Sequence, residues 1–354
     1  MNVLLIGFGK IGQIKAALWQ SMGMTVSVYD ISPKAQELIV ESGYQVATPL
    51  ALKELQLSKE LIVDVSTPAS THASALTWAL DTLAPNYPTH ILLEKPVVSS
   101  AEELRTLELT LARHADFDKN NLIVNESYFS SAALRKVKAM IDESGEELKL
   151  FSVELSKNRI SDNDNGRFFD YSLGSLGIEL PHMVAILQYF GLSLNELAGQ
   201  SPKLYVDRDR FDNQGFTMHY KENGTSIELK SFLGNFRLST STARQKNEGI
   251  IRVLKLATKS RHYKIIFDPA PGVPRYHAKI VVADKIANVI SEIVISDNHL
   301  EQHLRQLSSS KKPDTWNLSS LDNGLKITGI LLKLQKRAFV TELDLQEFEA
   351  KVLV

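Results

Sequence analysis

Residues 7–12 form the stretch that decides the fold, and they read Gly7-Phe8-Gly9-Lys10-Ile11-Gly12. An apolar run, Val3–Ile6, precedes this stretch, and a segment with helical spacing of apolar residues, Ile11–Met22, follows it. Three glycines spaced in this way between a strand and a helix are typical of a dinucleotide-binding turn. The first glycine allows the tight turn, the second lets the backbone approach a pyrophosphate, and the third lets the helix pack on the strand. The N–H groups and positive dipole end of that helix can then hold the phosphates. We therefore predict that all six residues contact a cofactor.

Asp30 directly follows the next apolar run, Thr25–Tyr29. A carboxylate at this position can accept hydrogen bonds from both hydroxyls of an adenosine ribose, and it would repel a 2′-phosphate. The sequence therefore favours NAD as the cofactor. NADP is the less favoured alternative, because Ser32 and Lys34 could still tolerate its phosphate.

The first third of the chain alternates short apolar runs with helical patterns. Further runs lie at Leu61–Val65, His90–Leu93 and Leu122–Val124. Helical patterns lie between the runs, at Pro33–Ser42, Thr71–Leu83 and Ala101–His114. Such alternation indicates parallel strands joined by crossover helices. We predict a doubly wound α/β domain of the Rossmann type over residues 1–125.

After residue 125 the expected strands follow one another directly. They cover Leu148–Lys157, Lys203–Val206, Gly215–Lys221, Ser226–Leu233, Ile250–Thr258 and His262–Phe267. Helical patterns occur at Ser130–Glu143, Ser175–Phe190, Asn298–Gln306 and Asp322–Lys336. Consecutive strands predict an α+β domain built on an open mixed or antiparallel sheet. We assign residues 126–354 to this domain and expect it to bind the substrate and to mediate oligomerisation.

Composition excludes several classes of function. The 40 basic residues nearly balance the 41 acidic ones, so the basic excess typical of nucleic-acid binding is missing. The chain has no cysteine, which excludes disulfides, thiolate nucleophiles and cysteine-ligated metals. The N-terminus begins with an apolar strand and lacks the charged region of a signal peptide, and no apolar run approaches the ~20 residues of a membrane span. We expect a cytoplasmic protein that binds neither nucleic acid nor a membrane.

Two polar turns follow strands of the first domain. Ser66, Thr67 and Pro68 come directly after Leu61–Val65, and His72 lies in the helix that follows. Glu94, Lys95 and Pro96 come directly after His90–Leu93. Ligands bind at the carboxyl ends of parallel strands, so we predict cofactor contacts from Ser66, Thr67, Pro68, His72, Glu94 and Lys95. A capped helix start with proline and a surface ion pair are the purely structural interpretations of these turns.

Taken together, these motifs resemble the glucose–fructose oxidoreductase/inositol dehydrogenase/MocA family over residues 1 to about 130. The Glu-Lys-Pro tripeptide in this context is the most specific element. The resemblance implies an α+β second domain with an open sheet. It also implies NAD(P)-dependent oxidation or reduction of a sugar, sugar derivative or cyclitol, in a homodimer or homotetramer.

The resemblance assigns roles to particular residues. Lys95 is expected to contact the substrate hydroxyl and to help position the nicotinamide. Pro96 matches a family proline that often follows a cis bond, which would fix the turn that aims Lys95. His182 matches the histidine of the second-domain motif Asp-x-Gly-x-His-x-x-Asp, and a near-neutral pKa suits histidine to exchanging the hydroxyl proton. We therefore predict Lys95 and His182 as the catalytic residues.

The second-domain motif also departs from the family. Its two aspartate positions are occupied by Ile178 and Ala185, and its glycine position by Leu180. Glu179 could replace the missing carboxylate one position later. This departure affects both the acid–base assignment and the expectation of a simple polyol substrate.

Further candidates for substrate binding lie in loops. Asn125 and Tyr128 follow the strand Leu122–Val124, and Arg167 ends a polar loop and could hold an anionic group. We predict substrate contacts from Asn125, Tyr128, Arg167, Glu179 and His182. His299 and His303 are spaced for one helix face, but the residues between them do not match a zinc motif. We therefore expect that face to be solvated and predict no metal site.

The predicted reaction is reversible hydride transfer between a carbon bearing a hydroxyl or carbonyl oxygen and the nicotinamide. Two alternatives remain, because a fold does not fix a function. One is a non-enzymatic NAD-binding regulator on the same fold, and the other is an NAD-dependent glycoside hydrolase.

Overall fold

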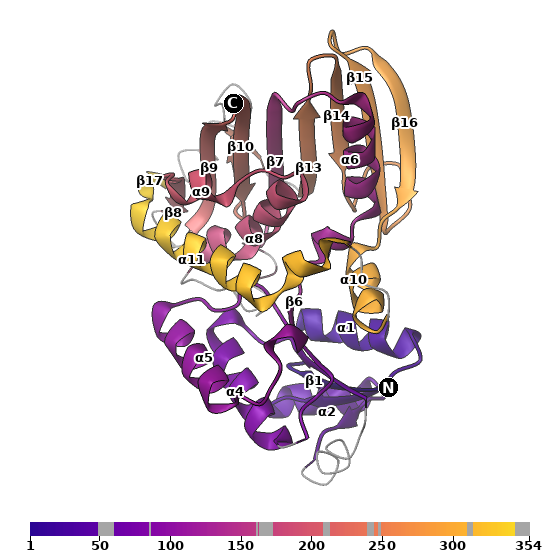
Figure 1. Cartoon of the computed structure of the whole chain (residues 1–354), viewed down its shortest axis with the longest axis vertical. Coiled ribbons are helices and arrows are strands. Elements are labelled where there is room, and N and C mark those ends of the chain that lie inside the picture. The colour runs from indigo at the N-terminus through magenta and orange to yellow at the C-terminus, as the bar shows by residue number, and fades with distance from the viewer. Residues whose placement is uncertain are drawn as a thin grey trace. The chain divides into compact units, whose positions relative to one another are not determined.

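The computed structural model describes residues 1–48, 60–84, 86–160, 162, 173–207, 213–238, 244–246, 249–309 and 314–343. The chain divides into two compact units (Figure 1). The first comprises Met1–Glu126 with Glu301–Thr328, and the second comprises Ser127–Leu300 with Gly329–Val354. The predicted domain bounds, 1–125 and 126–354, stay a prediction. In the structure, residues 301–328 pack with the N-terminal residues.

The first unit is built on a six-stranded parallel sheet with the order β3-β2-β1-β4-β5-β6. This order is that of a Rossmann domain, so the predicted fold is confirmed. The strands predicted in this unit agree with β1, β2, β4, β5 and β6 to within one residue, and β3 was not predicted. The strands are β1 (Asn2–Ile6), β2 (Thr25–Tyr29), β3 (Gln45–Val46), β4 (Leu61–Val65), β5 (His90–Leu93) and β6 (Leu122–Val124).

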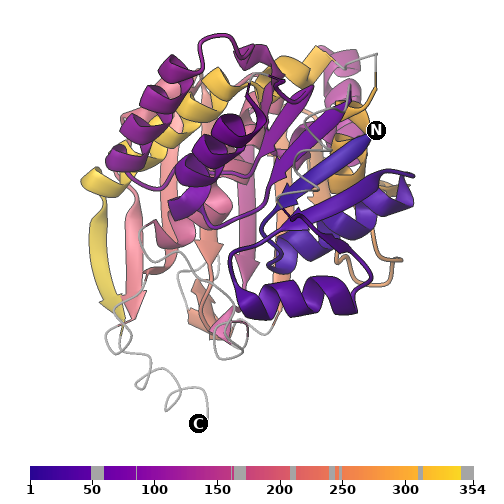
Figure 2. The same ribbon diagram turned by 90° about the horizontal axis from the view of Figure 1, so that it is seen from below.

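Helices cover both faces of this sheet. Figures 1 and 2 show α1 and α2 on one side, and α4 and α5 on the other. Local sequence explains where the helices begin. The Ser100 hydroxyl accepts a hydrogen bond from the Glu103 N–H, and the Glu103 carboxylate accepts one from the Ser99 N–H. These two reciprocal hydrogen bonds cap the N-terminus of α5. The elements are α1 (Lys10–Ser21), α2 (Pro33–Glu41), η1 (Ala69–Thr71), α4 (His72–Leu83), α5 (Ala101–Arg113) and η2 (Lys119–Asn121).

Late residues of the chain complete the first unit. Helix α11 (Leu321–Arg337) begins against the sheet, where a Cβ added to Gly324 would lie 2.6 Å from Cγ2 of Val124. The Val97 N–H also donates to the Thr328 hydroxyl at 3.2 Å. Because of the short distance to Val124, only glycine at position 324 allows helix α11 to come this close to the sheet. The neighbouring elements are α10 (His299–Leu307) and η4 (Asp314–Ser319).

The second unit contains a nine-stranded sheet with the order β16-β15-β14-β13-β7-β10-β9-β8-β17. The pairs β7–β10 and β8–β17 are parallel and the other pairs are antiparallel, so the predicted mixed sheet is confirmed. Strands β15, β16 and β17 were not predicted. The strands are β7 (Leu150–Lys157), β8 (Lys203–Asp207), β9 (Asn213–Glu222), β10 (Thr225–Phe232), β13 (Ile250–Ala257), β14 (Arg261–Ile266), β15 (His277–Asp284), β16 (Val289–Ser296) and β17 (Phe339–Leu343), with β11 (Phe236–Leu238) and β12 (Arg244–Lys246) in a separate pair.

Helices of the second unit pack on this sheet. Helix α8 contacts β7, β9 and β10, and α6 contacts β14, β15 and β16. A buried aspartate, Asp297, fixes the start of α6: it accepts a hydrogen bond from the Ser131 hydroxyl at 2.8 Å and one from the Ala132 N–H at 2.7 Å. The helical elements are η3 (Ser127–Ser130), α6 (Ala132–Ser144), α8 (Gly174–Tyr189) and α9 (Leu194–Ala198).

We predict that Asp297→Ala destabilises the protein by about 2–3 kcal/mol, because it leaves a buried hydroxyl and a helix N–H without their acceptor. Urea unfolding followed by circular dichroism measures the change. Asp142→Ala is the control, since it removes only an exposed ion pair with Lys138 on the same helix and should cost less than about 0.5 kcal/mol. An equal loss of unfolding free energy in the two variants would show that Asp297 does not stabilise the start of α6.

Candidate functional site

The glycine turn has the geometry that a dinucleotide needs. Gly7 has a φ of 96°, and a Cβ there would lie 2.8 Å from the Ser66 carbonyl oxygen. A Cβ on Gly12 would lie 2.1 Å from the Gly7 carbonyl oxygen, so helix α1 could not approach the turn with any larger residue. A Cβ on Gly9 would point into open space, which leaves room for a ligand at the turn.

The start of helix α1 is available to an anion. Its N-cap is Gly9, which has no side chain to accept a hydrogen bond from the first turn, and that turn has no acidic residue. The N–H groups of Lys10, Ile11 and Gly12 therefore keep their capacity to bind phosphate oxygens.

Asp30 lies beside this turn, as the sequence predicts. One carboxylate oxygen accepts a hydrogen bond from the Phe8 N–H at 2.7 Å, and the other accepts one from the Ser32 N–H at 2.8 Å. Each carboxylate oxygen has further lone pairs, so the ribose hydroxyls of an adenosine could still bind. The two backbone contacts fix the carboxylate where that ribose is expected.

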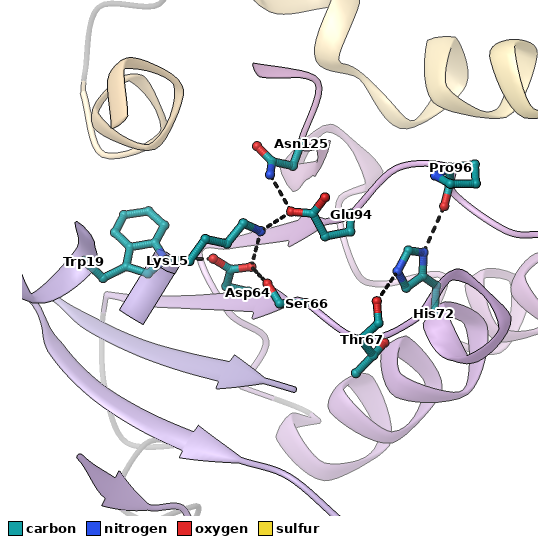
Figure 3. A network of polar contacts seen from close by, with 9 residues as sticks. All are labelled: Lys15, Trp19, Asp64, Ser66, Thr67, His72, Glu94, Pro96 and Asn125. Atoms are coloured by element: carbon teal, nitrogen blue, oxygen red, sulfur yellow. Dashed lines mark hydrogen bonds and ion pairs between the residues drawn. The ribbon is translucent and has the colours of Figure 1, made fainter. Parts of the chain in front are cut away.

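His72 joins the two polar turns at the carboxyl edge of the sheet (Figure 3). The side chain is buried; Nε2 lies 2.9 Å from the Thr67 carbonyl oxygen, and Nδ1 lies 2.9 Å from that of Pro96. Burial lowers the pKa of His72, although these carbonyl oxygens and the charge of Glu94 oppose the change. The structure thus shows a residue that connects the turns, and its predicted contact with the cofactor stays a prediction.

A network of charged residues lies under the same turns (Figure 3). The Lys15 ammonium is completely buried, 2.7 Å from Oδ1 of Asp64 and 2.6 Å from Oε1 of Glu94. Asp64 also accepts hydrogen bonds from Trp19 Nε1 at 2.7 Å and from the Ser66 hydroxyl at 3.0 Å. The network connects α1 to the ends of β4 and β5.

The partners in this network keep one another charged. Burial alone would lower the pKa of Lys15, but Asp64 and Glu94 outweigh it and raise that pKa above 10.5. Burial alone would raise the pKa of Glu94, but Lys15 outweighs it, helped by Asn125 and Lys95, and lowers that pKa below 4.5. Glu94 is therefore a carboxylate at neutral pH.

Lys15, Asp64 and Trp19 were not among the residues predicted from the sequence. The signal was present, because Lys15 lies on the buried face of α1 with Ala16 and Trp19, at helical spacing. Asp64 likewise interrupts the otherwise apolar strand β4. A charge in each of two buried elements indicates an ion pair.

Lys95 and two unpartnered polar atoms complete the edge of the first unit. Lys95 is half-buried, and the peptide bond to Pro96 is cis. The Thr67 hydroxyl and the Asn125 carbonyl oxygen Oδ1 are buried, and neither has a hydrogen-bond partner in the described part of the chain. Asn125 Nδ2 donates to Oε1 of Glu94. Buried polar atoms without partners point to a ligand at this edge.

In the second unit the predicted residues Tyr128 and His182 are in contact. The buried Tyr128 ring contacts the His182 ring edge-on, with centroids 5.2 Å apart, and stacks on the His299 ring at 4.6 Å. Glu179 and His182 are partly exposed on the mostly buried helix α8, and their i,i+3 spacing puts them on one face.

The structure corrects one prediction and leaves another untested. The helix face of His299 and His303 is not solvated, because His299 stacks on Tyr128, and His303 is buried and stacks on Trp316 at 5.5 Å. Arg167 lies outside the described residues. Within the described ranges no group of residues is arranged to hold a metal ion, and no helix is long and apolar enough to cross a membrane.

Comparison with known families identifies the first unit. Residues 1–117 match the family model named GFO_IDH_MocA, an oxidoreductase family with an NAD-binding Rossmann fold. The Rossmann part of the first unit is therefore similar to the NAD-binding domains of this family. No curated protein matches the chain.

Solved structures extend the likeness to the whole chain. The 3-ketoreductase KijD10 from Actinomadura kijaniata, solved with NADP and TDP-benzene, has a TM-score of 0.70 and 15% identity; the match covers 97% of this chain and 99% of that one. The UDP-N-acetylglucosamine 3-dehydrogenase GnnA from Acidithiobacillus ferrooxidans has a TM-score of 0.63 and 13% identity, with 96% and 97% covered. The protein therefore shares the two-part fold of these oxidoreductases.

We predict that Lys15→Met destabilises the protein by about 3–5 kcal/mol at pH 7, because two buried carboxylates lose their cation. The loss should shrink as the pH falls below 4.5. Glu94 has a lowered pKa, so its stabilisation exists above that value and disappears as the pH falls through its folded pKa. Urea unfolding of both proteins between pH 3 and pH 9 measures the difference. A variant as stable as the wild type at pH 7 would show that the ion pairs contribute nothing.

Proposed function

We propose that this protein is an NAD(P)-dependent oxidoreductase that acts on a CH–OH or carbonyl carbon of a sugar or sugar derivative. The observation that carries the proposal lies within one unit. The carboxyl ends of β1, β4 and β5 bring the glycine turn, Thr67 and the Glu94–Lys95 pair to one edge of the sheet. When bound, the nicotinamide supplies or accepts the hydride.

The residues present fit this cofactor. The N–H groups at the start of α1 suit the pyrophosphate, and Asp30 suits the adenosine ribose. The unpartnered Thr67 hydroxyl lies next to Gly7, where a Cβ added to the glycine would be 3.0 Å from Cγ2 of Thr67. These features support cofactor contacts from Gly7, Ser66, Thr67 and Pro68 as well.

Lys95 is proposed to bind the reacting oxygen. Its positive charge contributes to the lowered pKa of Glu94. A protonated Lys95 can donate a hydrogen bond to a carbonyl or alkoxide oxygen and so stabilise the charge that develops there. His182 is proposed to exchange the proton, and Glu179, on the same face of α8, is the alternative group.

The names of the similar structures support a substrate class to test. KijD10 was solved with a thymidine diphosphate compound, and GnnA is named for a nucleotide sugar. Nucleoside diphosphate sugars are therefore the first compounds to test, with Asn125, Tyr128 and Arg167 as the further proposed contacts. A cyclitol substrate, a homodimer or homotetramer, and a cytoplasmic location stay predictions.

We predict that NADH binds more tightly than NADPH, because Asp30 accepts hydrogen bonds from ribose hydroxyls and repels a 2′-phosphate. Asp30→Ala should weaken NADH binding about tenfold and reduce this preference. Titration of both cofactors, followed by their fluorescence, measures the constants, and thermal melting checks that the variant folds. Equal or tighter NADPH binding by the wild type would show that Asp30 does not select the cofactor.

We predict that Lys95→Ala keeps cofactor binding but loses turnover by about 10²-fold or more, and that His182→Asn loses about 10²–10⁴-fold. Nicotinamide absorbance, measured with a nucleotide sugar that the wild type turns over, gives the rates. Lys138→Ala, an exposed lysine on α6, is the control and should be unchanged.

Distinct outcomes separate the candidates. Full activity of His182→Asn with loss in Glu179→Gln would move the proton exchange to Glu179. Binding of NAD(H) without net turnover of any compound would favour a regulator, whereas sugar release without net NADH formation would favour a glycoside hydrolase.

A further inference from the structure

Asn125 has an acceptor that the fold does not use. The residue directly follows β6 and is only 4% exposed. Its Nδ2 donates to Oε1 of Glu94, whereas its carbonyl oxygen Oδ1 is buried and has no hydrogen-bond partner in the described residues. A buried amide oxygen that makes no hydrogen bond costs free energy, and such an atom in a native fold calls for a ligand or another explanation.

The network determines which way this amide faces. A carboxylate can only accept hydrogen bonds, so the NH₂ group of Asn125 must face Glu94, and its oxygen must face away. Figure 3 shows this arrangement, with the nitrogen toward Glu94 and the oxygen on the opposite side. Rotating the amide would place two acceptors against each other.

Lys15 holds the carboxylate that fixes this orientation. Its ammonium lies 2.6 Å from the same Oε1 atom and lowers the pKa of Glu94, which keeps Glu94 an acceptor. Asp64 holds Lys15 in turn, and Trp19 and Ser66 hold Asp64. A series of buried contacts thus runs from α1 and β4 to the amide at the end of β6.

We propose that Oδ1 of Asn125 accepts a hydrogen bond from the carboxamide NH₂ of the nicotinamide, and that Lys15 positions this acceptor through Glu94. The inference rests on the proposed function, because it requires a nicotinamide cofactor. The carboxyl ends of β5 and β6 are adjacent, so Asn125 lies one strand from Lys95, where the proposed reaction takes place. Asn125 then binds the cofactor and not, as the sequence indicated, the substrate, and Lys15 is a positioning residue that touches no ligand.

Cofactor analogues test this proposal without any substrate. In 3-acetylpyridine adenine dinucleotide a methyl group replaces the NH₂, and in nicotinic acid adenine dinucleotide a carboxylate replaces the amide. The wild type should bind NAD⁺ about three- to tenfold more tightly than the acetylpyridine analogue, because the analogue has no N–H to donate. The wild type should bind the carboxylate analogue still more weakly, because the carboxylate of that compound can only accept hydrogen bonds and would face the acceptor Oδ1 of Asn125. Isothermal titration calorimetry of the full chain measures these ratios.

Variants test which residues cause the preference for NAD⁺ over the acetylpyridine analogue. In Asn125→Ala the ratio of NAD⁺ to acetylpyridine-analogue affinity should fall to about one. Lys15→Met should lower the same ratio, because burial without the cation favours the protonated form of Glu94, which can donate to Oδ1 and let the amide of Asn125 turn. If that variant does not fold, Lys15→Met with Asp64→Asn removes the buried charges as a pair and serves the same purpose. Lys138→Met, which removes an exposed ion pair, should keep the wild-type ratio.

The possible failures are distinguishable. A wild type that binds NAD⁺ but shows the same ratio as Asn125→Ala overturns the proposal for Asn125. A ratio lost in Asn125→Ala but unchanged in the folded Lys15 variant overturns the role of Lys15. A wild type that binds no nicotinamide dinucleotide at all shows that the proposed function is wrong.

Discussion

The ammonium of Lys15, enclosed between the carboxylates of Asp64 and Glu94, is the interaction on which the first unit depends. Removing these charges from water costs several kcal/mol for each ion, and only close pairing and further hydrogen bonds offset the cost. The contacts reach the first helix and the ends of three strands, β4, β5 and β6. They therefore set the positions of the turns around them. A core of apolar side chains at the same place would pack the elements together but would not fix the direction of a carboxylate or an amide.

The sequence predicts the first unit well because short, fully buried parallel strands and amphipathic helices give strong periodic patterns. The glycine turn, Asp30 and the polar turns all lie where their positions after strands imply. Strand β3 has only two residues, which is too short to show an alternating pattern of apolar residues. In β16 the outward side chains Val289, Ile290 and Val294 are apolar as well, so the alternation of a half-buried strand is blurred. Strand β17 pairs in parallel with the distant β8, and local sequence does not encode that pairing.

The site is less predictable than the fold, because a motif gives the type of a residue and not its partners. His72 follows a family pattern, yet its ring faces backbone carbonyl oxygens of two turns. The contact of His299 with Tyr128 joins residues far apart in the chain, and helical spacing alone suggested a solvated face. Lys15 and Asp64 had a usable signal, since each is a charge in a buried element, but their pairing emerges only when α1 packs on β4.

The packing of residues 301–328 with the N-terminal residues has a consequence for synthesis of the protein. The ribosome makes the six strands of the first sheet within the first 124 residues, but Gly324 and Thr328, which lie against Val97 and Val124, come some 200 residues later. During that interval the nascent domain exposes apolar surface at Val97 and Val124. Contacts between such distant parts of a chain also form slowly, because the entropy cost of closing a long loop comes before the contacts can offset it. The first unit can thus complete its packing only after Thr328 has left the ribosome, and exposed apolar surface of this kind is what chaperones bind in general.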